Sequence, residues 1–168
     1  SKRVSNEQFA EIKRAFLDHQ VLFFKDQNEV APEMHVMFGK RFGVLHSHPA
    51  APTMKGYPEI FEIHATRDSK IANGEFWHSD VSCDQTPPLG TMLQLHILPS
   101  CGGDTMFSNM YSAFESLSER LQAFLSGLTA THESEHIYRG RYNDRGKNDS
   151  EIDCPRAVHP VIRTHPET

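Results

Sequence analysis

The sequence has few cysteines and no paired arrangement of them. Only three occur among its 168 residues. They are Cys83, Cys101 and Cys154, and they form no C-x-x-C pair. An odd number without the spacing of a disulfide framework is typical of a chain kept in a reducing compartment. No secretory hydrophobic segment precedes them. We therefore expect a cytoplasmic protein.

The sequence also lacks a basic run and a long hydrophobic run. Lys and Arg total 17 against 22 Asp and Glu, so the formal net charge is -5 with histidine neutral. This mildly acidic balance does not favour a nucleic-acid partner, which is held through its phosphates. No stretch approaches the roughly 18 apolar residues that a membrane span needs. We expect a soluble protein whose partners include neither nucleic acid nor a membrane.

The length is that of one globular domain. A domain of ~150 residues buries close to 70% of its unfolded surface, which is enough for a hydrophobic core. We therefore expect a single domain over residues 1–168. The chain begins with Ser1 rather than Met, and it ends at Thr168, soon after a predicted strand. From this we expect both ends to be incomplete.

Two helices are predicted near the start of the chain. Ser5 and Gln8 form a capping-box pattern, and the apolar residues that follow recur at helical spacing, which predicts a helix over 6–19. Pro32 fits the first turn of a second helix, which we expect to stop at Gly43.

The rest of the chain is predicted to consist of short strands with one helical pair. The pair covers 111–125, with Ser118 capping its second part and Gly127 ending it. The charged stretch 135–153 is expected to be a mobile loop, and its part 139–153, which carries both signs of charge, is expected to be solvated. The predicted strands are 21–24, 59–64, 76–81, 91–98, 105–109, 129–133 and 158–164. This pattern favours an antiparallel sandwich or barrel decorated by helices over an alternating βαβ sheet.

Histidine is the residue type in excess, at 11 of 168 residues. The strongest local feature is His78 and Asp80, two positions apart on a predicted strand. Residues i and i+2 of an extended chain point to the same face, so the imidazole and the carboxylate can converge on one cation. One further histidine would complete the facial triad of non-haem Fe(II) oxygenases, which leaves positions open for substrate and O₂.

Several other motifs surround this pair in a fixed order. They are residues 19–27, 42–43, 77–81 (Trp-His-Ser-Asp-Val), 86–88 (Thr-Pro-Pro), 98–105 (Leu-Pro-Ser-Cys-Gly-Gly-Asp-Thr), 113–118 (Ala-Phe-Glu-Ser-Leu-Ser) and 159–168. In residues, order and spacing they resemble the taurine dioxygenase family of Fe(II)- and 2-oxoglutarate-dependent dioxygenases. The resemblance covers nearly the whole chain.

The resemblance implies a fold and an activity. The fold would be mainly β with helices, a double-stranded β-helix (jelly roll, cupin-like) whose C-terminal part is missing from this chain. The enzyme would use Fe(II), 2-oxoglutarate and O₂ to hydroxylate a small anionic organic substrate, such as a sulfonate, an alkyl sulfate ester or a carboxylate, with release of succinate and CO₂. We also expect a homo-oligomer.

The resemblance also assigns roles to individual residues. By motif position, His78 and Asp80 would be the first two iron ligands and the catalytic pair. Thr105 would hydrogen-bond the distal carboxylate of 2-oxoglutarate, because a hydroxyl can donate to a carboxylate without adding charge. The implied substrate contacts are His48, Val81 and Tyr138.

Two positions depart from the taurine enzyme. That enzyme has a tyrosine three residues after the equivalent of His48, where this chain has Ala51. It has an asparagine three residues before the motif tryptophan, where this chain has Gly74, with Asn73 displaced by one. Two polar contacts to a small sulfonate are thus missing. A bulkier sulfonate, an alkyl sulfate ester or a carboxylate therefore suits the sequence at least as well as taurine.

The sequence does not supply a complete metal site. The resemblance places the third ligand, a histidine, and an arginine for 2-oxoglutarate beyond Thr168, while His159 and His165 occupy motif positions that are structural. One alternative is a non-catalytic metal- or ligand-binding β-sandwich with an incomplete site. Another is a zinc hydrolase using His78 and Asp80, which is disfavoured because no catalytic base is evident near these ligands.

Overall fold

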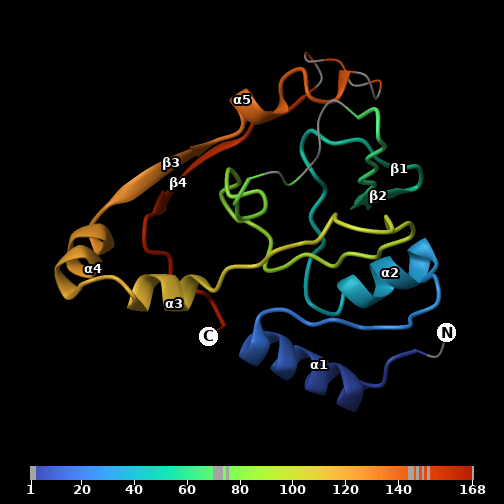
Figure 1. Ribbon diagram of the computed structural model, residues 1–168, viewed down its shortest axis with the longest axis horizontal. Helices are drawn as coiled ribbons and strands as arrows, with labels where there is room; N and C mark the ends of the chain where they lie inside the picture. Colours follow the sequence, from blue (N-terminus) through green and yellow to red (C-terminus); the bar gives the residue numbers. More distant parts are fainter. Residues whose placement is uncertain are drawn as a thin grey trace. The chain divides into compact units, whose positions relative to one another are not determined.

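The helices and strands of the chain are short (Figure 1). The computed structural model describes residues 3–69, 74, 76–143, 146, 148, 150 and 152–167. The helices are α1 (Asn6–His19), α2 (Pro32–Gly39), α3 (Met110–Glu115), α4 (Glu119–Ser126) and α5 (Glu135–Tyr138). The strands are β1 (Thr53–Met54), β2 (Tyr57–Phe61), β3 (Thr129–Glu133) and β4 (Arg156–Pro160).

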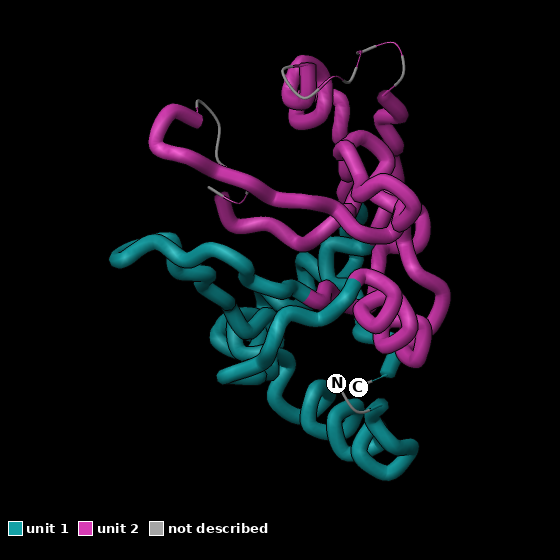
Figure 2. The backbone as a smooth tube through the Cα atoms, turned by 90° about the vertical axis from the view of Figure 1, so that its right-hand side faces the viewer, with its two compact units in different colours: residues 1–31, 93–129, 160–168 teal, residues 32–92, 130–159 magenta. Residues whose placement is uncertain are grey.

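The chain divides into two units, coloured separately in Figure 2. The first unit consists of residues 1–31, 93–129 and 160–168. The second consists of residues 32–92 and 130–159. The described helices include none that is both long and apolar enough to cross a membrane.

Helix α1 has the predicted bounds, and its first turn shows why. The Ser5 hydroxyl accepts the Gln8 N–H at 3.1 Å, and the Gln8 side chain accepts the Ser5 N–H at 2.9 Å. This reciprocal capping box satisfies two backbone donors that the helix cannot pair internally. Gln20 caps the C-terminal end of the helix. It takes a left-handed conformation with φ 65° and donates its N–H to the Phe16 carbonyl.

The predicted helical pair is also confirmed, with small changes at its ends. Helix α3 begins at Met110, where the Asn109 side chain accepts two backbone N–H groups of the first turn. The Ser118 hydroxyl caps α4 by accepting the Leu121 N–H at 3.3 Å, and Gly127 ends that helix. Ser and Asn favour these positions because their short side chains reach the unpaired donors.

Helix α2 ends at Gly39, four residues earlier than predicted. After Gly39 the backbone continues in tighter i→i+3 bonds, the last from the Phe42 N–H to the Gly39 carbonyl. A Cβ at Gly39 would lie 2.9 Å from Leu45 Cδ2, so the following loop packs closely against the glycine. The glycine thus serves a close approach that the sequence pattern does not reveal.

The strands pair in two separate two-stranded ladders. Strands β1 and β2 are antiparallel, and an irregularity separates their two register pairs. In the other ladder, β3 has the predicted bounds, whereas β4 begins two residues earlier and ends four residues earlier than predicted. Oε1 of Glu133, at the end of β3, lies 3.7 Å from Nη1 of Arg156, at the start of β4. These strands therefore also run antiparallel.

Four predicted strands do not form. Residues 21–24, 76–81, 91–98 and 105–109 have no strand hydrogen bonds, and many of their apolar side chains are exposed. In the first of these segments, Phe23 and Phe24 are 75% and 58% exposed. A strand exists only with a partner strand, and an apolar pattern cannot supply one. The described residues form a mixed helix and strand structure, and the jelly roll stays a prediction.

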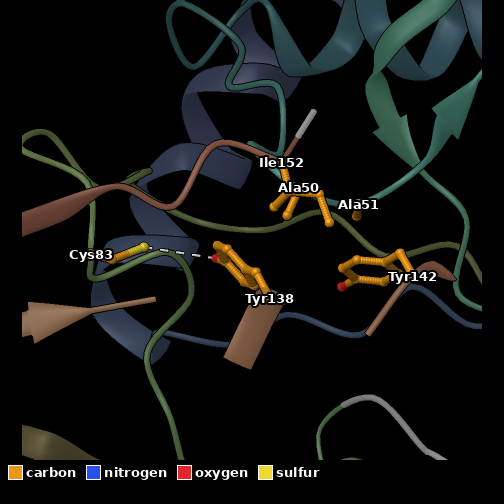
Figure 3. Close-up of a cluster of buried hydrophobic side chains, with 6 residues drawn as sticks. All are labelled: Ala50, Ala51, Cys83, Tyr138, Tyr142 and Ile152. Atoms are coloured by element: carbon orange, nitrogen blue, oxygen red, sulfur yellow. Dashed lines mark hydrogen bonds between the residues drawn. The ribbon is translucent and has the colours of Figure 1, made fainter. Parts of the chain in front are cut away.

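A small core lies in the second unit and brings together residues far apart in the sequence (Figure 3). Its buried members are Ala50, Ala51, Cys83, Tyr138, Tyr142 and Ile152. Tyr138, Tyr142 and Ile152 come from the stretch 135–153, which the sequence predicts to be a loop. That prediction is wrong for these three buried residues and for helix α5 at the start of the stretch. Part of that stretch, like Asn73, lies outside the described residues.

Candidate metal and substrate site

The predicted metal pair forms, although not on a strand. His78 Nε2 lies 3.3 Å from Asp80 Oδ1, and the side chains are 54% and 49% exposed. The backbone is irregular through Ser79 and enters a turn at Asp80. The i, i+2 spacing therefore brings the two groups together, although the backbone is irregular and not the predicted strand.

The hydrogen bond on the far side of the His78 ring fixes its tautomer. Nδ1 lies 2.6 Å from the Phe76 carbonyl oxygen, which can only accept, so Nδ1 carries a proton and donates it. In the neutral ring the lone pair is then on Nε2, the nitrogen that lies beside Asp80 Oδ1. A histidine that binds a metal commonly donates its other N–H to a carbonyl in this way.

The carboxylate of Asp80 is also held on its far side. Thr91 Oγ1 donates to Asp80 Oδ2 at 2.5 Å, which leaves Oδ1 facing the imidazole. Two ligand atoms 3.3 Å apart can each reach one cation at about 2.1 Å. The residues present therefore fit two sites of a metal centre. Sequence reasoning missed Thr91, and no local signal links residues eleven positions apart in an irregular segment.

The part of the chain that the structure describes does not complete the centre. No group of three His, Cys, Asp or Glu side chains able to hold a metal occurs among the described residues. His159 Nε2 lies 2.9 Å from the Asp84 backbone carbonyl, to which it donates. The His165 ring accepts the Glu167 N–H at 3.2 Å.

Val81, directly after the metal pair, has a strained backbone. Its φ is 46°, in the left-handed region. A β-branched residue rarely adopts this region, and the cost is of order 1–3 kcal/mol. Val81 packs against the buried cluster, which holds it in place. The strain is thus located where the chain turns from the metal pair to the core.

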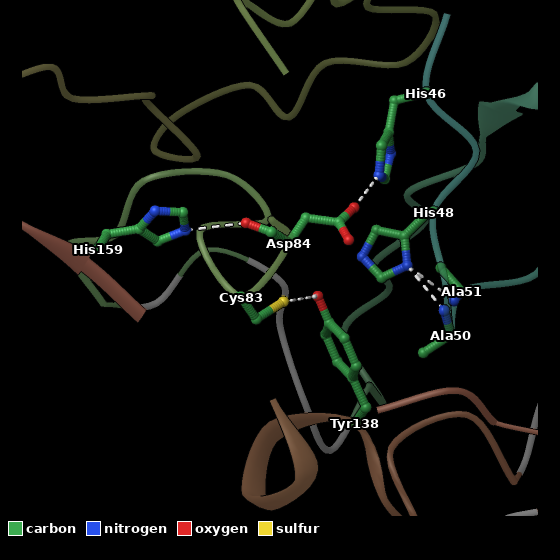
Figure 4. Close-up of polar contacts among 8 residues, drawn as sticks. All are labelled: His46, His48, Ala50, Ala51, Cys83, Asp84, Tyr138 and His159. Carbon is green, nitrogen blue, oxygen red and sulfur yellow. Dashed lines mark hydrogen bonds and ion pairs between the residues drawn. The ribbon is translucent and has the colours of Figure 1, made fainter. Parts of the chain in front are cut away.

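His48 lies in the second unit and has the opposite tautomer (Figure 4). Its Nδ1 accepts the backbone N–H groups of Ala50 and Ala51 at 3.2 and 2.9 Å. The neutral ring therefore carries its proton on Nε2, on the opposite side of the ring from these two amides. Burial lowers the pKa of His48 to about 4, with a smaller contribution from His46, while the charge of Asp80 raises it. His48 is a neutral donor near pH 7.

Aromatic rings surround His48. Its ring centroid lies 5.2 Å from that of Phe61, 5.1 Å from that of Tyr138 and 6.4 Å from that of Tyr142. Burial and the contact of its hydroxyl with the Cys83 thiol raise the pKa of Tyr138, so its phenol stays protonated. An anion bound beside His48 Nε2 would meet one neutral donor among aromatic rings.

The two departures from the taurine enzyme also lie in this unit. Ala51 is only 3% exposed and belongs to the buried cluster, so its small side chain is enclosed. Gly74 has φ +85°, and a Cβ there would lie 4.0 Å from His78 Cε1. A side chain at position 74 would therefore adjoin the metal pair. Thr105 is exposed and belongs to the first unit.

Comparison with known proteins identifies the family. The sequence profile described as "Taurine catabolism dioxygenase TauD, TfdA family" matches residues 1–168, the whole chain. This chain belongs to the TauD/TfdA family. The resemblance inferred from the motifs is thereby confirmed.

Individual relatives in the TauD/TfdA family carry related names. An "Alkylsulfatase" of Acinetobacter baylyi is 34% identical over 94% of this chain and 51% of its own length. A "Putative alpha-ketoglutarate-dependent sulfonate dioxygenase" of Schizosaccharomyces pombe is 30% identical over 99% of this chain and 44% of its own. An "Alpha-ketoglutarate-dependent sulfate ester dioxygenase" of Pseudomonas putida is 28% identical over 92% and 53%. The chain spans about half the length of these curated relatives.

Proposed function

We propose that this chain is part of an Fe(II)- and 2-oxoglutarate-dependent dioxygenase that hydroxylates a small organic anion and releases succinate and CO₂. The observation that carries the proposal is the His78–Asp80 pair, in which Nε2 of the imidazole and Oδ1 of the carboxylate lie 3.3 Å apart and Nδ1 donates to a backbone carbonyl. Membership of the TauD/TfdA family supports it over the whole chain.

His78 and Asp80 would hold the iron, and Phe76 and Thr91 would orient them. The bound iron and 2-oxoglutarate supply the oxidising chemistry with O₂. The protein groups decide which positions on the metal are taken and which stay open. A third histidine and an arginine from chain beyond Thr168 would complete the site, and Thr105 would donate to the distal carboxylate of 2-oxoglutarate.

The substrate would be a sulfonate, an alkyl sulfate ester or a carboxylate. His48 would donate its Nε2–H to the anionic group, and a neutral donor among aromatic rings suits a singly charged head with an organic body. Val81 and Tyr138 would contact that body. The relatives named as sulfonate and sulfate ester dioxygenases support this class of substrate. Ala51 cannot supply the polar contact that a tyrosine makes to a small sulfonate, which favours bulkier members of this class.

The architecture of the whole protein is part of the same proposal. Residues 1–168 would form part of a single catalytic domain with a jelly-roll fold, in a cytoplasmic homo-oligomer. The family and the mixed helix and strand structure support the fold.

Substrate-dependent succinate formation by the full-length protein tests the function. A panel of alkyl sulfates, sulfonates and aryloxy acids is supplied with Fe(II), 2-oxoglutarate and O₂. We expect at least one acid to stimulate succinate release, and the Asp80→Ala variant to lose that release. Asp68→Asn, an exposed change outside the site, is the control and should retain it.

Two results would favour the alternatives. A wild-type protein that binds iron and an organic anion but forms no succinate with any acid would indicate a binding module. Turnover of a sulfate ester with Zn²⁺ and without O₂ would indicate a hydrolase. A separate result concerns the ligand: if the Asp80→Ala variant retains substrate-dependent succinate release, Asp80 is not an iron ligand.

A further inference from the structure

The segment that follows the metal pair is a tight turn. The Asp84 N–H donates to the Val81 carbonyl at 3.0 Å, closing residues 81–84 into one turn. The left-handed Val81 begins this turn directly after Asp80. Because the turn is short and strained, the position of Asp80 depends on what holds its far end.

Three histidines outside the metal pair hold that turn, and Figure 4 shows two of them. His46 Nε2 donates to the Asp84 carboxylate at 2.5 Å, and His159 Nε2 donates to the Asp84 carbonyl at 2.9 Å. The third contact joins His132 Nδ1 and the Ser82 hydroxyl at 3.0 Å. The excess of histidine thus serves the turn beside the metal pair more than the metal itself.

His46 differs from the other two because of the segment that carries it. His132 belongs to β3 and His159 to β4. The centroids of these two histidine rings lie 5.4 Å apart. His46 instead lies two residues before His48, on the loop whose Ala50 and Ala51 amides hold the His48 ring. The His46–Asp84 contact therefore joins the substrate loop directly to the turn of the metal pair.

We propose that the His46–Asp84 contact couples the metal pair to the His48 loop, so that filling the metal site orders the substrate donor. This inference rests on the proposed function of His78 and Asp80. The side chains of His46 and Asp84 are 26% and 32% exposed, so the contact is partly shielded from solvent. A charge-assisted bond in such a place is a direct link through which a small displacement of Asp80 would reach the loop. His46 and Asp84 are positioning residues in this account.

Hydrogen exchange in the full-length protein tests the coupling. The exchange of the Ala50 and Ala51 amides is measured without ligand and with saturating Mn²⁺ plus 2-oxoglutarate, in the absence of turnover. Coupling free energies between sites correspond to roughly 5- to 150-fold. We therefore expect the ligands to slow exchange of these two amides by about fivefold or more in the wild type.

Three variants separate coupling from general damage. His46→Phe keeps a ring but no donor, and it should reduce the slowing to less than about twofold at full Mn²⁺ occupancy. Asp84→Asn keeps an oxygen acceptor and should retain most of the slowing. His64→Phe, an exposed histidine on the same unit, is the matched control and should behave as the wild type. If His46→Phe does not fold, Asp84→Ala replaces it.

The outcomes distinguish this inference from the proposed function. Wild-type protein that binds Mn²⁺ and 2-oxoglutarate without slowing these amides overturns the coupling and leaves the metal site intact. Slowing in His46→Phe equal to that in the wild type also overturns it. Failure of the wild type to bind Mn²⁺ overturns the proposed function, and the coupling with it.

Discussion

His48 and His78 lie in the same unit and are held in opposite ways. Two backbone N–H groups donate to Nδ1 of His48, so its proton is on Nε2. A backbone carbonyl accepts from Nδ1 of His78, so the neutral form of that ring has its lone pair on Nε2. In the proposed function, the same side chain would thus donate a hydrogen bond to an anion at one place and bind a metal at the other. The neighbouring backbone decides which.

His48 and His78 also differ in how far their side chains are buried. His48 is enclosed by aromatic rings, and its pKa falls to about 4. The side chain of His78 is 54% exposed and lies beside a carboxylate. A ring that stays neutral binds an anion without a change of charge near pH 7, whereas an exposed lone pair beside a carboxylate binds a cation.

The largest effect is expected from removing the carboxylate of the metal pair. Asp80→Ala leaves His78 as the single remaining ligand of the pair, so Fe(II) binding to the full-length protein should be lost. Anaerobic equilibrium dialysis measures it. His48→Phe is the contrasting variant and should retain the metal. Equal losses in the two variants would erase the distinction between ligand and donor.

A smaller effect is expected from removing the group that orients Asp80. Thr91→Val keeps the shape of the side chain but removes the bond to Oδ2. Outer partners of metal ligands typically contribute about 10- to 100-fold to affinity, and we expect a loss in this range. Competition with a coloured chelator measures it. Thr53→Val on β1 is the control, and a matching loss there would mean that the effect is not specific to the site.

His48→Phe should weaken substrate binding and leave metal binding unchanged. The variant keeps an aromatic ring in the enclosure but loses the Nε2–H. A hydrogen bond to a charged group contributes roughly 1.5–3 kcal/mol, so KM should rise about tenfold or more. Steady-state succinate release with any acid that the protein turns over measures it. If KM is unchanged and kcat instead depends more strongly on the Fe(II) concentration, His48 acts at the metal.

The smallest effect is on the pH dependence of stability. Because the pKa of folded His48 is about 4, below the ordinary 6.5, the unfolded chain takes up the proton first as the pH falls. His48 therefore lowers the unfolding free energy progressively from about pH 6.5 to pH 4. Urea unfolding of wild type and His48→Phe measures the difference, and the variant should show the shallower decline. A steeper decline in the variant would contradict the buried neutral ring.

Local signals in the sequence predicted the elements whose causes are local. The capping box at Ser5, the cap at Ser118 and the bounds of β3 depend on neighbouring residues, and all three are confirmed. The strand predicted over 91–98 has the right alternation, yet Leu95 is 63% exposed and no ladder forms. A strand depends on a partner, which the pattern within one segment does not contain.

The candidate site divides in the same way. The proximity of His78 and Asp80 could be predicted because their spacing is short. The groups that orient them could not, since Thr91 is remote from the pair along the chain and the Phe76 carbonyl is not a feature of residue type. The contact of His46 with Asp84 spans 38 residues. Tyr142 was assigned to a loop because its charged neighbours outweigh one aromatic residue in any composition argument.

The ¹⁵N resonances of the histidine rings in the full-length protein test the central claim most directly. Selective assignment of His48 and His78 reports which ring nitrogen carries the proton. The account predicts a proton on Nε2 of His48 and on Nδ1 of His78, and a large change at His78 Nε2 alone when Zn²⁺ is added as a diamagnetic probe. The same tautomer in both rings, or direct coordination of Zn²⁺ by His48, would contradict it.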